Sequence, residues 1–166
     1  WAKRNLAVLA IEGGQQEEAV KLYIEAVRMK PALLPLAVEC GQALLQSMQP
    51  RKWLELLKEL PTTVRSSGRI QLLEAQAALT IGEFKKVEQF FADEVILPTI
   101  REGELSLSDF WLEYHLRRLS SQENLEIDHE LRARVYREYP VPAHIDFRMR
   151  IEPHEQAGSL GEANKQ

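Results

Sequence analysis

An internal repetition is the feature that most constrains the fold of this chain. The segment "NLAVLAIEGGQQEEAVKLYIEAVRMKP" places small and aromatic residues at helical spacing on both sides of a glycine pair. Equal steps along the chain carry Ala7 to Gly41 and Gly41 to Ala75, so the register survives two full periods. A period of this length, about 34 residues, is typical of arrays of helical hairpins, in which neighbouring units bury one another's apolar faces. The sequence therefore predicts stacked antiparallel hairpins.

The larger residues of the pattern indicate how successive hairpins pack. Tyr23, Leu57 and Phe91 are also one period apart, and we expect them to fill the space between consecutive hairpins. Trp53 departs from the pattern, because it stands where the first unit has Ala19. If the register holds, the indole of Trp53 must be buried at a hairpin interface; an exposed Trp53 would mean that the second unit is out of register.

Apolar periodicity and the positions of prolines predict eight helices. The seventh begins at Ser106, a predicted cap, and the eighth runs from Asp128, a second predicted cap, to Glu138. Because this last pair lacks the small residues of the repeat, we expect it to cap the end of the stack. The first six helices are expected at residues 2–13, 16–29, 32–47, 50–59, 68–81 and 83–93.

The first unit resembles the tetratricopeptide repeat. Ala19, Tyr23, Ala26 and Pro31 occupy the signature positions, whereas Lys3 stands where that family usually has tryptophan. The resemblance extends from residue 1 to about residue 94, and the later units share the register more than the residues. It implies an all-α, right-handed stack of antiparallel hairpins over residues 1–139, with a C-terminal capping hairpin and an extended tail over 140–166.

A second resemblance rests on the order of three segments, "LPTTVRSSGRIQLLEAQAAL", "REGELSLSDFW" and "PVPAHIDFRM". They resemble the C-terminal helical region of an uncharacterised bacterial family that has an upstream β-sandwich domain similar to galactose mutarotases. That resemblance implies a carbohydrate-related whole protein whose sugar-handling residues lie outside this chain. The start at Trp1, inside a helical pattern, likewise leads us to expect a piece of a longer protein.

The tail contains "HIDFRMRI", in which apolar residues occupy every second position. This is the period of a half-buried strand, and a single strand must find a partner for its backbone. We expect Ile145, Phe147 and Met149 to anchor the tail, by adding a strand to a sheet of an upstream domain or by lying along the helices. Beyond residue 155 the polar, glycine-bearing sequence predicts disorder.

Composition and motifs argue against several functional classes. The net charge is −4 and the sequence has no basic stripe, so we expect no nucleic-acid partner; no apolar run reaches membrane-spanning length. Cys40, the one cysteine, is expected in the core of a protein from a reducing, cytoplasmic compartment. We find no catalytic or metal-binding constellation and expect no enzyme activity and no cofactor. His115 lies in a polar stretch that is better explained as a charged helix face with a Glu113 to Arg117 pair.

The face formed by the first helix of each hairpin is the predicted binding surface. By the tetratricopeptide resemblance, these helices line a groove, and Ile11, Leu45 and Leu79 would form an apolar stripe along it. Periodicity alone cannot distinguish a lined groove from a filled core, so both interpretations remain open. The predicted lining comprises Arg4, Val8, Ile11, Glu12, Val38, Gln42, Leu45, Gln46, Leu72, Gln76, Leu79 and Thr80.

These features favour a non-catalytic protein-interaction or scaffolding module. Its expected partner is a protein: its own upstream domain, another copy in a homo-oligomer, or an extended peptide that lies on the apolar stripe. The alternative is an accessory domain of a carbohydrate-active enzyme whose catalytic site lies outside this chain. Sugar binding by the isolated chain would favour the alternative.

Overall fold

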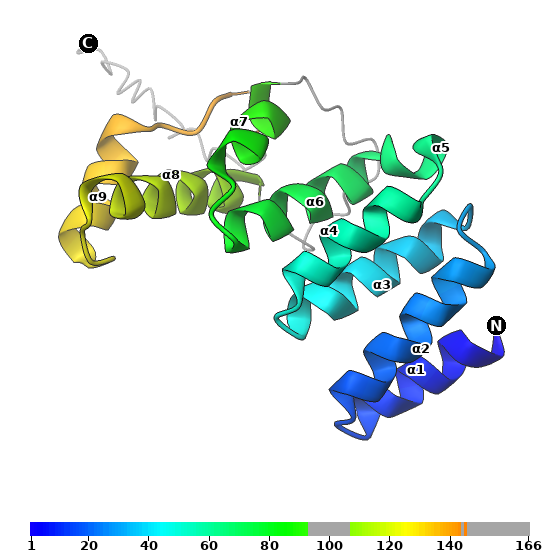
Figure 1. Ribbon diagram of the computed structural model, residues 1–166. Helices are drawn as coiled ribbons and strands as arrows, with labels where there is room; N and C mark the ends of the chain where they lie inside the picture. Colours follow the sequence, from blue (N-terminus) through cyan, green and yellow to red (C-terminus); the bar gives the residue numbers. More distant parts are fainter. Residues whose placement is uncertain (93–106, 144, 146–166) are drawn as a thin grey trace, which may run out of the picture.

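The computed structural model describes residues 1–92, 107–143 and 145, and every regular element in them is helical (Figure 1). The all-α prediction is thereby confirmed for this part of the chain. The helices are α1 (Ala2–Glu12), α2 (Gln16–Met29), α3 (Leu34–Gln46), α4 (Pro50–Glu59), α5 (Thr62–Arg65), α6 (Gly68–Thr80), α7 (Phe84–Ala92), α8 (Leu107–Glu123) and α9 (His129–Glu138).

Helices that are neighbours in sequence pack as antiparallel pairs, and the pairs lie one after another along the molecule (Figure 1). Gly14 joins α1 to α2 and Gly82 joins α6 to α7, with φ angles of 73° and 78°. These left-handed conformations favour glycine, so both turns follow from residues that the sequence pattern contains. Between pairs, α2 packs on α3, and both α3 and α4 pack on α6.

Prolines and caps explain most of the helix boundaries. Helix α4 begins at Pro50, as predicted, since proline is tolerated in the first turn. Helix α3 begins at Leu34, slightly later than predicted, with a proline in its own first turn. The sequence does not predict the short helix α5: after Pro61 the chain closes one helical turn, with Val64 buried. A single turn has no apolar periodicity from which it could be recognised.

The first helices of the three hairpins, α1, α3 and α6, bury residues at equivalent positions of the repeat. Ala7, Gly41 and Ala75 are all buried, and the next turn of each helix repeats this at Ala10, Leu44 and Ala78. On the other side, Glu12, Gln46 and Thr80 are all exposed. Helices α1, α3 and α6 therefore present corresponding faces to the core and to solvent.

Trp53 is completely buried, at 0% exposure, so the register of the second unit holds. Its indole lies against the backbone of Gly41, where a β-carbon would come within 2.9 Å of Trp53 Cζ2 and 3.0 Å of Leu73 Cδ1. The smallest residue of the pattern in α3 thus creates the space that the largest residue in α4 fills. Within the described residues, Trp53 Nε1 has no hydrogen-bond partner, which leaves packing as the source of its stabilisation.

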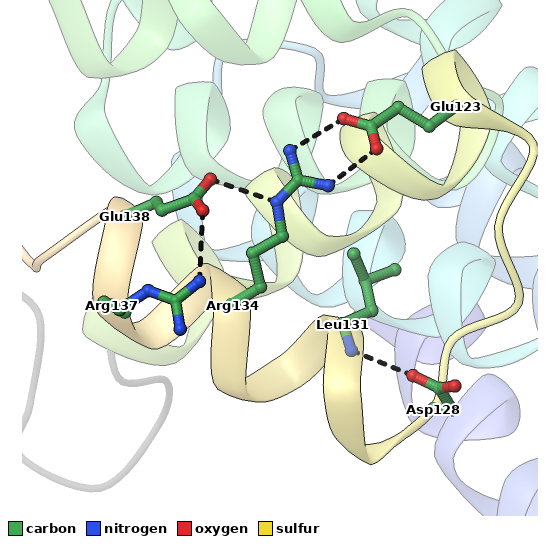
Figure 2. A network of polar contacts seen from close by, with 6 residues as sticks. All are labelled: Glu123, Asp128, Leu131, Arg134, Arg137 and Glu138. Carbon is green, nitrogen blue, oxygen red and sulfur yellow. Dashed lines mark hydrogen bonds and ion pairs between the residues drawn. The ribbon is translucent and has the colours of Figure 1, made fainter.

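Ion pairs made by Arg134 of α9 join this helix to α8 (Figure 2). The Nη1 and Nη2 atoms of Arg134 donate to the carboxylate of Glu123 at 2.6 and 2.9 Å, and its Nε donates to Glu138 at 3.1 Å. At the start of α9, Asp128 Oδ1 accepts from the backbone N–H of Leu131 at 2.8 Å. The predicted cap at Asp128 is confirmed; the predicted cap at Ser106 lies outside the described residues.

Replacing Asp128 with alanine should lower the free energy of unfolding by about 1 kcal/mol, because the start of α9 loses its side-chain acceptor. Asparagine keeps an acceptor oxygen, so Asp128→Asn should cost only a few tenths of that. Urea unfolding of the two variants measures the difference. Equal losses in both would mean that Asp128 acts through its charge and not through its hydrogen bond.

Candidate interaction surface

The three helices that carry the predicted groove residues are linked to one another, α1 to α3 by a side-chain pair and α3 to α6 by packing. The guanidinium of Arg4 in α1 donates two hydrogen bonds, each 2.8 Å long, to the carboxylate of Glu39 in α3. Helix α3 in turn packs on α6. The hydrogen bonds and charge of Glu39 raise the pKa of the Arg4 guanidinium. Arg4 therefore holds α1 against α3, and its charge is engaged within the chain.

Some side chains of the predicted lining are accessible to solvent, and the others are buried beneath the face. Ile11 and Leu45 are half-buried, whereas Leu79 is only 5% exposed, so the apolar stripe is open on α1 and α3 and closed on α6. Val38 and Leu72 are also buried and form part of the core beneath the face. The accessible lining consists of Arg4, Val8, Ile11, Glu12, Gln42, Leu45, Gln46, Gln76 and Thr80, half-buried or exposed in each case.

The glutamines of this face have unused side-chain amides. Gln42 and Gln46 are exposed and Gln76 is half-buried, and none of the three side chains makes a hydrogen bond within the described part of the chain. A primary amide offers both donors and an acceptor. Beside Ile11 and Leu45, these amides can pair with the backbone of an extended segment while its side chains meet the apolar stripe.

A separate surface pocket of about 620 Å³ lies between α2, the turn after α3, the start of α4 and Ile81 in the turn after α6. Its cationic side chains are Lys21, Arg51 and Lys52, and its acidic one is Glu17. Lys21 also lies 3.7 Å from Glu18. The sequence does not predict this pocket, because its walls come from two helices and two turns with no common spacing. The pocket is therefore mainly cationic, and its helical walls, α2 and α4, are not helices of the glutamine-bearing face.

Aromatic rings gather where α7 meets α8. Phe91 lies in edge contact with Trp111 at 5.0 Å between centroids, and 5.4 Å from Phe110. Phe91 is the third member of the Tyr23, Leu57 series, and it fills the space between its own hairpin and α8 as the pattern predicts. Helix α8 thus packs on α7 through aromatic side chains and not through the small residues of the repeat.

His115 is buried in this region, which sequence reasoning missed. The predicted ion pair from Arg117 to Glu113 is present at 2.6 Å, but His115 is 4% exposed and its ring stacks on Tyr139 at 4.0 Å. Neither ring nitrogen has a hydrogen-bond partner within the described residues, and burial, assisted by the charge of Arg118, lowers its pKa to about 4. At neutral pH the side chain is an uncharged aromatic packing residue.

The start of the tail is held against α8. Trp111 Nε1 donates to the carbonyl of Tyr139 at 3.2 Å, and Ser108 Oγ donates to the carbonyl of Ile145 at 3.4 Å. The side chain of Ile145 is buried in the cluster that contains Phe110 and Tyr114. Of the three predicted anchors, Ile145 lies along the helices, while Phe147 and Met149 fall outside the described residues.

The reactive residue types offer no site among the described residues. Cys40 is fully buried in α3, and burial raises the pKa of its thiol to about 12, so it remains protonated. No three side chains of His, Cys, Asp or Glu in the described segments are placed to hold a metal ion. Nor does any described helix have the length and apolarity needed to cross a bilayer.

No protein family model, curated protein or solved structure matches this chain at a significant level.

Proposed function

We propose that this chain is a non-catalytic protein-interaction module of the tetratricopeptide type, which binds an extended, partly apolar segment of a partner protein across α1, α3 and α6. The observation that supports the proposal is the set of unused glutamine amides beside half-open apolar side chains. In this account α8 and α9 are the capping hairpin of a right-handed stack. The module works without a cofactor, in the reducing cytoplasm.

The recognition follows from the two kinds of side chain on the face. Ile11 and Leu45 are equivalent positions of successive units, and burial of their remaining exposed area contributes about 25 cal/mol per Å² of apolar surface. Gln42 and Gln76 are likewise one period apart, so their amides recur at the spacing of the units. A partner strand that crosses the helices therefore meets alternating apolar and hydrogen-bonding positions.

The proposal is tested by selecting binders from a random peptide library on the full chain and measuring their affinity by fluorescence anisotropy. Gln42→Ala combined with Gln76→Ala should weaken the selected peptides about tenfold or more, since each lost hydrogen bond is worth about 1 kcal/mol. The matched control combines Gln89→Ala on α7 with Gln122→Ala on α8, two exposed glutamines outside the face. Peptides that lose affinity equally in both double variants would count against this face.

A further inference from the structure

Three hairpins of the described chain close with the same backbone turn. At its centre stand Gly14, Met48 and Gly82, one period apart, with left-handed φ angles of 73°, 55° and 78°. Their backbone N–H groups donate to the carbonyl three residues earlier, at 2.9, 3.0 and 3.2 Å. The N–H of the next residue donates to the carbonyl five residues earlier, at 2.7, 2.8 and 2.9 Å. The turn geometry is therefore conserved along the stack, and only the residue at its centre changes.

Met48 is the residue of the three that does not suit this backbone. A left-handed φ favours glycine, because a β-carbon crowds the neighbouring carbonyl oxygen, so methionine lowers stability there. Packing could offset this cost, but Met48 is 76% exposed. At Gly14 and Gly82 a β-carbon would find no atom within 4 Å, so the turn itself does not need a side chain at this position. Strained residues that the fold does not require are typical of functional sites.

Met48 lines the surface pocket of about 620 Å³ between α2 and α4. Part of the remaining lining is apolar: Val20 and Pro50 are buried, and Ile24 and Ile81 are half-buried. All of the lining residues belong to the α1–α2 and α3–α4 pairs and the turn after α6. The pocket thus offers an apolar wall, to which the exposed Met48 side chain adds.

The charged side chains at the pocket favour an anion. Arg51 and Lys52 are exposed, and their side chains make no ion pair or hydrogen bond within the described part of the chain. Lys21 lines the pocket from α2 and lies 3.7 Å from Glu18, which is outside the lining. Among the described residues of the lining, these three cations stand against the single carboxylate of Glu17. The local potential is therefore positive and attracts a negatively charged group.

Gln49 adds a hydrogen-bond acceptor to the pocket. Its Oε1 atom is buried and has no partner within the described residues, and the residue belongs to the lining. A buried acceptor without a donor costs stability, so a ligand that donates an N–H gains this bond. Inorganic phosphate would meet the cations but would leave the apolar wall uncovered. A peptide can supply a carboxylate, an N–H group and an apolar side chain together.

We propose that this pocket binds a short acidic peptide segment of a partner protein, with a carboxylate between the cations of α2 and α4 and an apolar side chain on Met48. A backbone N–H of the peptide donates to Gln49 Oε1. The flexible thioether of methionine adapts to the side chain that it covers, and this contact offsets the cost of methionine in the turn. The pocket is separate from the glutamine-bearing face, and the inference does not rest on the proposed function.

The probe is a set of capped pentapeptides in which one glutamate and one leucine occupy every pair of positions among glycines. NMR titration of the full, isotope-labelled chain gives their affinities and the amides that shift. We expect the best peptides to shift the amides around Met48 and Lys52, and to bind about fivefold more tightly than their glutamine counterparts. This difference should shrink as salt is added. Absence of binding, equal affinity of the glutamine peptides, or equal affinity of inorganic phosphate would overturn the proposal.

Substitution of the two cations of α4 tests the place of the carboxylate. Arg51→Gln combined with Lys52→Gln should weaken the best peptides about fivefold or more, because two exposed ion pairs are lost. The matched control combines Lys85→Gln on α7 with Arg132→Gln on α9, two exposed cations away from the pocket, and should leave the affinity unchanged. Equal losses in the two double variants would overturn the proposal, because the attraction would then come from the charge of the whole chain.

Met48→Gly separates a binding role from a structural one. Glycine suits the left-handed turn, so the melting temperature should rise by about 2–4 °C. The same variant should bind the best peptides about fivefold more weakly, since the apolar contact is lost. A fall in melting temperature, or an unchanged affinity, would overturn the proposal. So would a loss of affinity in Gln42→Ala with Gln76→Ala, because the peptide would then lie on the glutamine-bearing face.

Discussion

Replacing Trp53 with alanine is expected to lower the free energy of unfolding by about 3–5 kcal/mol, because the change leaves a cavity where a fully buried indole filled the α3–α4 interface. The indole makes no hydrogen bond within the described residues, so the loss comes from packing alone. Chemical denaturation measures it. Trp1→Ala, which removes an exposed indole, is the matched control and should change stability by less than about 0.5 kcal/mol.

The close contact of Trp53 with Gly41 makes a second substitution informative. Gly41→Ala should cost about 1–3 kcal/mol, since its β-carbon would meet the indole at 2.9 Å. In a chain that already carries Trp53→Leu, the same substitution should cost much less, because the ring that it strikes is gone. A double-mutant cycle measures this coupling. Additive losses would show that Gly41 is required for some other reason, such as its approach to Leu73.

Acidification from pH 6.5 to pH 4 should remove about 3 kcal/mol of stability through the buried His115. Its pKa is lowered to about 4 in the folded chain, against about 6.5 for an unfolded histidine. Between these two pKa values the imidazole is protonated in the unfolded chain and neutral in the folded chain. The stabilisation that comes from the neutral, buried His115 is therefore complete above pH 6.5 and is lost as the pH falls towards 4. Below pH 4 both states are protonated and the loss levels off.

The change His115→Phe isolates this effect. Phenylalanine retains a ring that can stack on Tyr139 but has no titrating group, so the variant should lack the part of the pH dependence that His115 causes. Glu25, Glu59 and Glu123 also have lowered pKa values from ion pairs, and they lose their contribution at lower pH in both chains. The difference between the two stability curves therefore reports His115. Parallel curves from pH 7 to pH 4 would mean that the imidazole is protonated without cost.

Much of the fold could be predicted because local signals agreed with one another. The glycines at 14 and 82 mark turns that need a positive φ, Pro50 marks the start of α4, and Asp128 caps α9. Together with the repeat period, these residues determine the helix order and most boundaries. The exception, α5, is a single turn whose formation depends on Pro61 and not on any apolar period.

The candidate surface was harder to predict, because exposure depends on what lies above each helix. Ile11, Leu45 and Leu79 are equivalent in sequence, yet Leu79 is buried in the cluster that also contains Phe110 and Ile145. Likewise, the charged neighbours of His115 predict an exposed helix face, whereas its burial follows from Tyr139, which lies on the far side of α9 in the sequence. Helical spacing gives the direction of a side chain and not the neighbour that it meets.

We propose above that α1, α3 and α6 together form the binding face for an extended partner segment. A hydrogen-exchange footprint of the full chain, measured with and without a library-selected peptide at saturating concentration, tests it most directly. We expect slower exchange in segments 8–12, 42–46 and 76–80, with exchange in α2, α4 and α7 unchanged. Protection confined to α2 and α4, around the cationic pocket of Lys21, Arg51 and Lys52, would contradict it.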